Sequence, residues 1–211
     1  MKPSPGPPNR RQSQGEQSRR AILASASALF SQHGYAATPV SRLSDDCGLP
    51  PSSIYWHFGS KEGVLAAVTE HSVEQLLTGL PRADQFEGSA IERFEQMVDV
   101  IATRLERRET PTRLIVRLAL EEAEARTVES HAAVVVALGQ ARELVLDRWR
   151  EALTAVFRPT DAAGSELVDS LARLGRAVAI GCYITESAPR GDVRPTLETF
   201  VSTVAALAAV R

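Results

Sequence analysis

Side chains able to contact a polyanion are gathered in one short stretch of the chain, 51–58 (PSSIYWHF). The hydroxyls of serine and tyrosine donate hydrogen bonds to phosphate oxygens, and a helix lying in a DNA groove can also meet base edges. The polar and aromatic residues of this stretch are Ser52, Ser53, Tyr55, Trp56 and His57. The sequence contains no paired carboxylates, no metal-ligand spacing and no nucleophile elbow, so no motif favours an enzyme.

The elements around this stretch predict two short helices joined by a tight turn over residues 39–58. Val40 and Leu43 form an apolar i, i+3 pair, and Gly48 interrupts the pattern. Proline is tolerated at the first position of a helix, so the second helix is expected to begin near Pro51. A helix, a glycine-containing turn and a second helix is the arrangement that places a helix in a DNA major groove. Short helix pairs also occur as plain packing units.

The flanking segments also predict helices. Residues 18–33 carry an apolar stripe that Gly34 ends, with Arg19 and Arg20 in the expected first turn, where a phosphate would be favourable. Thr38 is predicted to cap the second helix, 39–46, with Pro39 at its first position, and Ser60 to cap the fourth helix, which extends to Gly79. Residues 1–17, rich in Pro, Gly, Ser and Gln, are expected to be a disordered tail.

Composition limits the class of protein. The chain has 211 residues, of which 44% are hydrophobic, enough for a sizeable core. Residues 1–61 contain seven Lys and Arg against three acids, whereas the rest contains 17 against 23, so one end is suited to a polyanion. Two distant cysteines indicate no disulfide framework, metal site or cofactor. No apolar run suits a membrane span or signal peptide, which favours the cytoplasm.

The rest of the chain has only helical periodicity, so the predicted fold class is all-α. Further helices are expected at 86–107, 110–126, 128–157, 161–187 and 195–210, which makes about nine in total. Three segments are predicted: a tail at 1–17, a helix-turn-helix domain at 18–78 and a helical domain at 79–211.

The order of motifs within residues 18–70 resembles the DNA-binding domain of the TetR family of bacterial transcriptional regulators. The matching features are the helix ending in Leu29-Phe30, Gly34-Tyr35 with Thr38 following, a Cys-Gly-Leu turn, Ile-Tyr-Trp-His-Phe, and Ser-Lys-Glu. The resemblance implies a C-terminal helical domain that binds a small molecule and forms a homodimer. It also implies a double-stranded DNA operator as partner.

The resemblance assigns DNA contacts to the start of the second helix, to the third helix and to the lysine that opens the fourth. Phosphate contacts are expected from Thr38, Tyr55, His57 and Lys61, with Ser53 as a further candidate. Base edges are expected to meet Pro51, Ser52, Ser53 and either Trp56 or Arg42, and a thymine methyl to meet Pro51 or Val40. Trp56 is equally compatible with packing, and His57 with a plain surface position. Pro50-Pro51 replaces the usual hydroxyl cap and basic residue, which predicts weaker direct readout of bases.

An effector pocket is expected among the fifth to eighth helices, with mostly apolar walls. A core or surface position is the alternative for each of its candidates, which are Phe94, Met97, Ile101, Arg117, Glu121, His131, Trp149 and Cys182. Cys47 is interpreted as a small hydrophobic residue rather than a redox sensor. Small residues in the last two helices favour close packing, which suits a homodimer interface.

These observations predict a sequence-specific DNA-binding transcriptional regulator, a repressor that a small apolar or amphipathic effector releases from its operator. The signal is expected to pass through the fourth helix. The alternative is an architectural or cell-cycle factor that uses the same DNA-binding head without a ligand.

Overall fold

The computed structural model describes residues 10–107, 109–124, 132–185 and 193–210. Within them the prediction of an all-α fold with about nine helices is confirmed, and no strand is formed. A single 3-10 turn, η1, follows the fourth helix. The elements are α1 (Arg10–His33), α2 (Val40–Cys47), α3 (Pro51–Phe58), α4 (Lys61–Thr78), η1 (Ala83–Gln85), α5 (Ala90–Arg107), α6 (Thr110–Glu124), α7 (Ala132–Phe157), α8 (Ala162–Thr185) and α9 (Arg194–Ala209). No helix in these ranges is long and apolar enough to cross a membrane.

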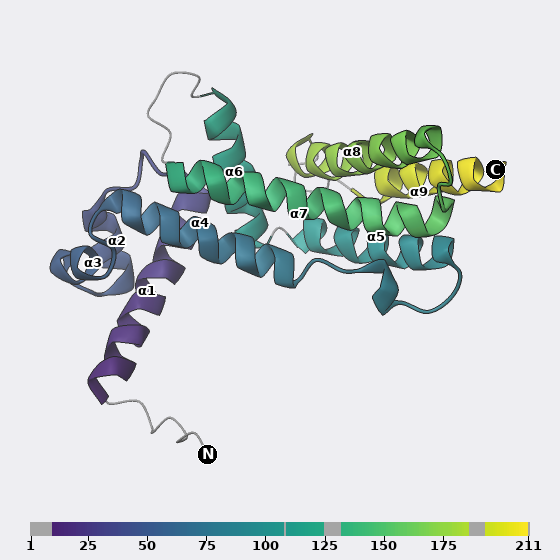
Figure 1. The fold of residues 1–211 in the computed structure, drawn as a ribbon. Coiled ribbons are helices and arrows are strands. Elements are labelled where there is room, and N and C mark those ends of the chain that lie inside the picture. The colour runs from purple at the N-terminus through teal and green to yellow at the C-terminus, as the bar shows by residue number, and fades with distance from the viewer. Residues whose placement is uncertain (1–9, 108, 125–131, 186–192, 211) are drawn as a thin grey trace, which may run out of the picture.

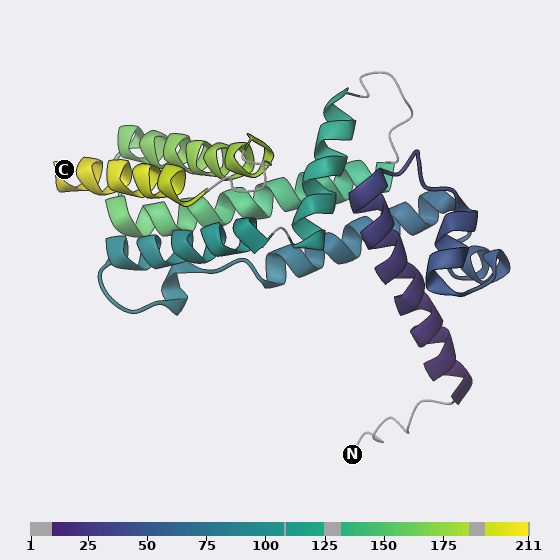
Figure 2. The same ribbon diagram turned by 180° about the vertical axis from the view of Figure 1, so that it is seen from behind.

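The helices are arranged in an elongated molecule with distinct ends. Helices α2 and α3 lie at one end, beside α1 and the start of α4, whereas α5, α8 and α9 lie side by side at the other end (Figures 1 and 2). The long helices α4 and α7 connect the two ends, and α6 crosses between them. The short helices of the predicted helix-turn-helix are therefore far from the C-terminal bundle.

Two hydrophobic clusters match this arrangement. The body core is formed by α5, α7, α8 and α9, with Phe94, Trp149 and Phe200 in edge-to-face contact. The head core is formed by α1–α4, around Ile22, Phe30, Leu43, Ile54 and Val64. Four side chains from α6 and α7 complete the head core, so the head is packed directly against the body: Leu114, Leu118, Val134 and Leu138.

Helix α1 begins at Arg10 rather than at Ser18, so the prediction of a disordered tail is wrong for residues 10–17. The prolines of the tail all precede Arg10, and the residues after it are mostly acceptable helix formers. Extending a helix that packing has already nucleated adds one hydrogen bond per residue, which is far less costly than nucleation. Arg19 and Arg20 consequently lie in the middle of α1, not in its first turn. Residues 1–9 lie outside the described part.

The start of α2 also differs from the prediction. Pro39 occupies the N-cap position with extended backbone, and α2 has no side-chain cap. Thr38 instead donates its hydroxyl backward to the Gly34 carbonyl oxygen at 2.8 Å, because its side chain is fully buried. The predicted cap of α4 is confirmed: Ser60 Oγ accepts a hydrogen bond from the Gly63 amide at 3.1 Å.

Helix α5 begins at Ala90, four residues later than predicted. Gly88 has a φ of +108°, which stops a helix from running through it. Ser89 and Glu92 then form a reciprocal cap, in which the Ser89 amide donates to Glu92 at 2.7 Å and the Glu92 amide donates to Ser89 Oγ at 3.4 Å. This is the capping-box pattern of Ser followed three residues later by Glu. The expected helical residues 125, 126, 128–131, 186 and 187 lie outside the described part of the chain.

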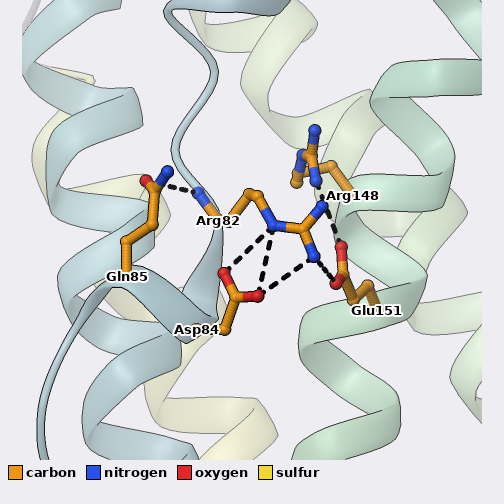
Figure 3. Close-up of polar contacts among 5 residues, drawn as sticks. All are labelled: Arg82, Asp84, Gln85, Arg148 and Glu151. Carbon is orange, nitrogen blue, oxygen red and sulfur yellow. Dashed lines mark hydrogen bonds and ion pairs between the residues drawn. The ribbon is translucent and has the colours of Figure 1, made fainter.

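An ion-pair network fastens the turn after α4 to α7 (Figure 3). Arg82 donates to both Asp84 oxygens, at 3.0 and 3.3 Å from Nε, and also contacts Glu151 of α7. Arg148 donates to the same Glu151 carboxylate at 3.1 Å. The Arg82 guanidinium holds the pKa of Asp84 below its ordinary value. The network therefore holds the turn that follows α4 against α7.

Candidate DNA-binding surface and effector cavity

Helix α3 is anchored to the head core by Ile54 and the partly buried Phe58, and much of its remaining surface is open to solvent. Ile54 is fully buried in the head core. Tyr55 and Trp56 next to it are 49% and 78% exposed, so Trp56 does not contribute to the core. Pro51 and Ser52 are exposed, whereas Ser53 and His57 are half-buried. An eight-residue helix held by two apolar side chains leaves its exposed side chains accessible to a partner.

Helix α2 is locked to α1 by polar contacts. Ser25 of α1 donates to Asp46 at 2.5 Å, and the Arg42 guanidinium donates to His33 Nε2 at 2.9 Å. Ser44 donates to the Leu49 carbonyl oxygen at 2.7 Å and closes the turn between α2 and α3. These bonds fix the orientation of α3, and they hold Arg42 against the end of α1.

The N-terminus of α4 combines a cation with an aromatic ring. Lys61 Nζ lies 4.2 Å from the centre of the Tyr35 ring, and the Tyr35 hydroxyl donates to Glu62 at 2.9 Å. Burial, followed by the bond to Glu62, raises the pKa of Tyr35 to about 12. Burial lowers the pKa of Lys61, which the charge of Glu62 partly opposes. Lys61 is thus positioned at a helix N-terminus, where backbone amides already favour an anion.

The predicted DNA-contact residues all lie at one end of the molecule, and all but one of them are accessible to solvent. Val40, Arg42, Lys61 and the α3 residues have at least partly accessible side chains, whereas Thr38 is fully buried. Thr38 therefore supports the joint between α1 and α2 from inside. Arg19, which the sequence analysis placed near an expected phosphate, has its guanidinium carbon 5.3 Å from the centre of the Phe58 ring. The packing of α1 beside α3 brings these two side chains together.

A cavity of about 210 Å³ lies between the two ends, with walls formed by helices α4 to α8 and by Leu80 in the turn after α4. Most of its wall is aliphatic, and the polar side chains are few. The polar residues in the wall are Thr112, Arg142, Arg176 and Tyr183. Trp149 of α7 also lines the cavity.

Of the predicted effector residues, Ile101 and Trp149 line this cavity. Phe94, Met97 and Cys182 are buried in the body core instead, because the same apolar periodicity serves a core and a cavity wall equally well. Arg117 lies on the opposite side of α6 and donates to the Gln32 carbonyl oxygen of α1 at 3.3 Å. His131 and the side chain of Glu121 lie outside the described part of the chain.

Sequence reasoning missed Arg142, Arg176 and Tyr183. Each lies on a helix that was predicted from the sequence. Helical periodicity indicated which neighbouring apolar residues face inward, but it gave no sign that these polar side chains border a cavity. The packing of α7 against α8 brings them to the same wall.

Comparison with known proteins agrees with this architecture. Residues 22–68 match the family described as "Bacterial regulatory proteins, tetR family". A Bacillus subtilis (strain 168) protein, the uncharacterized HTH-type transcriptional regulator YerO, is 27% identical over 88 residues, which is 37% of this chain. The chain covers 30% of the length of that curated relative.

Solved structures share the fold over nearly the full length. The reduced form of E. coli NemR has a TM-score of 0.67 at 20% identity, covering 89% of this chain and 95% of NemR. A TetR family regulator from Agrobacterium tumefaciens has a TM-score of 0.69 at 17% identity, covering 88% and 98%. A complex of SmeT with triclosan has a TM-score of 0.66 at 19% identity, covering 90% and 91%.

A helix-turn-helix head on an all-helical body defines a class of DNA-binding regulators. The matched head and the shared fold agree with the resemblance seen in the sequence. The head of the chain, residues 22–68, is similar to the DNA-binding domain of the TetR family of transcriptional regulators, and the whole chain shares the fold of solved TetR-family structures.

Proposed function

We propose that this chain is a homodimeric transcriptional repressor that a small-molecule effector releases from its DNA operator. The observation that carries the proposal is the exposed face of α3, where Tyr55 and Trp56 are open to solvent, with Lys61 at the start of the next helix. Helix α3 is the second helix of the helix-turn-helix and would lie in the major groove. Such a protein acts on DNA in the cytoplasm and needs no catalytic chemistry.

The DNA contacts divide by chemistry. Tyr55, His57, Ser53 and Lys61 are assigned to phosphates, and Pro51, Ser52 and Trp56 to base edges or thymine methyls. Thr38 is assigned an indirect part, because its hydroxyl is buried on the Gly34 carbonyl. Arg42 and Val40 remain candidates at the margin of α2, and Arg42 would have to leave His33 to reach a base.

The domain division is part of the proposal: a head of residues 18–78 binds DNA, and a body of residues 79–211 binds effector and partner. The body presents exposed apolar side chains on α8 and α9, including Leu174 at 49% and Leu207 at 40% exposure. Pairing of these last two helices with those of a second copy would cover them. A dimer places two α3 helices about one turn of DNA apart, roughly 34 Å.

Helices α4 and α6 connect cavity and head. Val64, Leu65 and Val68 of α4 belong to the head core, whereas Leu76 of the same helix lines the cavity. On α6, Leu114 is in the head core, and Val116 lines the cavity. A ligand that changes the cavity therefore changes both helices that hold the head. It would favour a state in which the two α3 helices are no longer spaced for DNA.

A bound small molecule in a protein of the same fold, SmeT with triclosan, supports an effector for this fold. The alternative, an architectural factor that uses the head without any ligand, is less well supported because of the cavity beside α4 and α6. Thermal stabilisation by a small molecule, with loss of DNA binding, would separate the two functions.

The test uses a duplex selected from a random-sequence library by the full-length protein. Lys61→Ala removes one phosphate contact per protomer, so we expect weaker binding and a salt slope smaller by about 1.8 per dimer, from ~0.9 per phosphate. Tyr55→Ala is expected to weaken binding as well, while Tyr55→Phe separates hydroxyl from ring, and Lys61→Arg retains the charge. Unweakened binding by a folded Tyr55→Ala, Lys61→Ala dimer would refute the assignment of α3.

A further inference from the structure

The cavity wall contains two arginines in otherwise apolar surroundings. Arg142 of α7 and Arg176 of α8 line the same cavity as Leu76, Ile101 and Trp149. A guanidinium remains charged at all ordinary pH values, and a charge beside apolar surface is costly unless it is hydrated or paired. A hydrophobic ligand without an acid group would make that cost larger by displacing water.

Within the described residues, Arg176 has no carboxylate partner. Among the residues described as lining the cavity there is no Asp or Glu. Helix α8 carries no acid from Ser170 to Thr185, and its Asp169 is bonded to Arg150 at 2.8 Å. No carboxylate in the described ranges forms an ion pair with Arg176, whereas Arg82, Arg150 and Arg194 each have two. Arg176 is the arginine of the cavity that a ligand carboxylate can pair with.

Neutral polar groups are also present in the wall. Thr112 of α6 and Tyr183 of α8 both line the cavity, on helices that carry or face the two arginines. A planar guanidinium binds a carboxylate through two parallel hydrogen bonds, and such charge-assisted bonds are among the strongest in proteins. The remaining wall, from α4, α5 and α6, is aliphatic and suits a hydrocarbon or ring system.

We propose that the cavity binds an amphipathic organic acid, with its carboxylate on Arg176, assisted by Arg142, and its apolar part against Trp149 and the aliphatic wall. The proposal rests on the proposed function, because it names the chemical class of the effector of that same cavity. Acids of this class would be selected over neutral or cationic molecules of the same shape.

Trp149 provides a reporter inside the cavity. The chain has two tryptophans, and Trp56 lies at the far end on α3. In a Trp56→Phe background the fluorescence arises from Trp149 alone. Three matched probes are titrated: 1-naphthaleneacetate, its neutral amide, and the cation 1-naphthylmethylamine. We expect the acid to quench Trp149 and to bind at least about tenfold more tightly than the amide.

Arg176→Met keeps the aliphatic length and removes the charge, so it should lower the affinity for the acid about tenfold and leave the amide unchanged. Arg173→Met is the matched control on α8, because Arg173 is exposed and outside the cavity wall. Light scattering checks that both variants keep the oligomeric state of the parent. A loss of acid binding caused by dissociation of the oligomer would count against the assignment of Arg176.

Equal binding of acid and amide, or preference for the cation, would overturn the acid preference and leave an effector of another class in place. Absence of Trp149 quenching by all three probes would overturn the cavity as a binding site for this class. DNA binding by the protein with Trp56 intact, measured separately, tests the proposed function, so the two failures are distinguishable.

Discussion

Gly175 of α8 is the position where a single added methyl group tests the packing around Trp149. A Cβ at residue 175 would lie 2.8 and 2.9 Å from two carbons of the Trp149 ring and 3.0 Å from Phe200. Carbon atoms in contact prefer roughly 3.5–4.0 Å, so both rings would have to move. They have little room, because Trp149 and Phe200 are 2% and 5% exposed and both contact Phe94.

Two effects of opposite sign determine the magnitude for Gly175→Ala. Overpacking a core costs about 1–3 kcal/mol, and replacing a glycine inside a helix by alanine gains about 1 kcal/mol. We expect a net loss of up to about 2 kcal/mol in the free energy of unfolding. For a chain of this size each kcal/mol lowers Tm by roughly 2–4 °C.

Gly139→Ala on α7 is the matched control, because a Cβ at residue 139 has no neighbour within 4 Å. Only the helical gain applies there, so Tm should rise. The assay is thermal unfolding followed by circular dichroism, with Trp149 fluorescence in the Trp56→Phe background reporting the displaced ring. If both alanine variants were stabilised equally, the close packing of α8 on Trp149 would be refuted.

Two further predictions concern the head. Tyr35→Phe removes the hydroxyl and, with it, the hydrogen bond to Glu62. The pKa of that hydroxyl is about 12 in the folded protein, whereas the ordinary value for tyrosine is 10.0. The unfolded chain loses that proton first, so the stability contributed by Tyr35 is complete below pH 10 and falls between pH 10 and 12. Urea unfolding should show a less steep decline for the variant over that range, and parallel curves would contradict the prediction. Leu114→Ala leaves a cavity at a fully buried site in the head core and should lower the free energy of unfolding by about 2–5 kcal/mol. Leu120→Ala on the same helix should lower it much less, because Leu120 is 44% exposed. Equal losses in urea unfolding would show that α6 does not complete the head core.

The helices and their ends were largely predictable, because their signals are local. Gly34 and Gly48 end α1 and α2, Pro51 opens α3, and Ser60 caps α4, each through the backbone of a few neighbouring residues. The predictions failed where two local signals competed. Thr38 bonds backward to Gly34 instead of capping α2, and the start of α1 follows from extension of a packed helix beyond its apolar stripe.

The amino-acid sequence by itself determined the all-helical class and the head with its helix-turn-helix, which contains the segment proposed to face DNA, since these depend on residue order over short distances. Tertiary structure alone decided which apolar residues line the cavity, because an inward-facing Phe94 and an inward-facing Trp149 have the same periodicity. It also placed Arg176 in that wall and Leu114 in the head core, because both positions depend on helices that are distant in sequence packing together. The helix-turn-helix can thus be recognised from a short segment, whereas the effector cavity exists only where five helices meet.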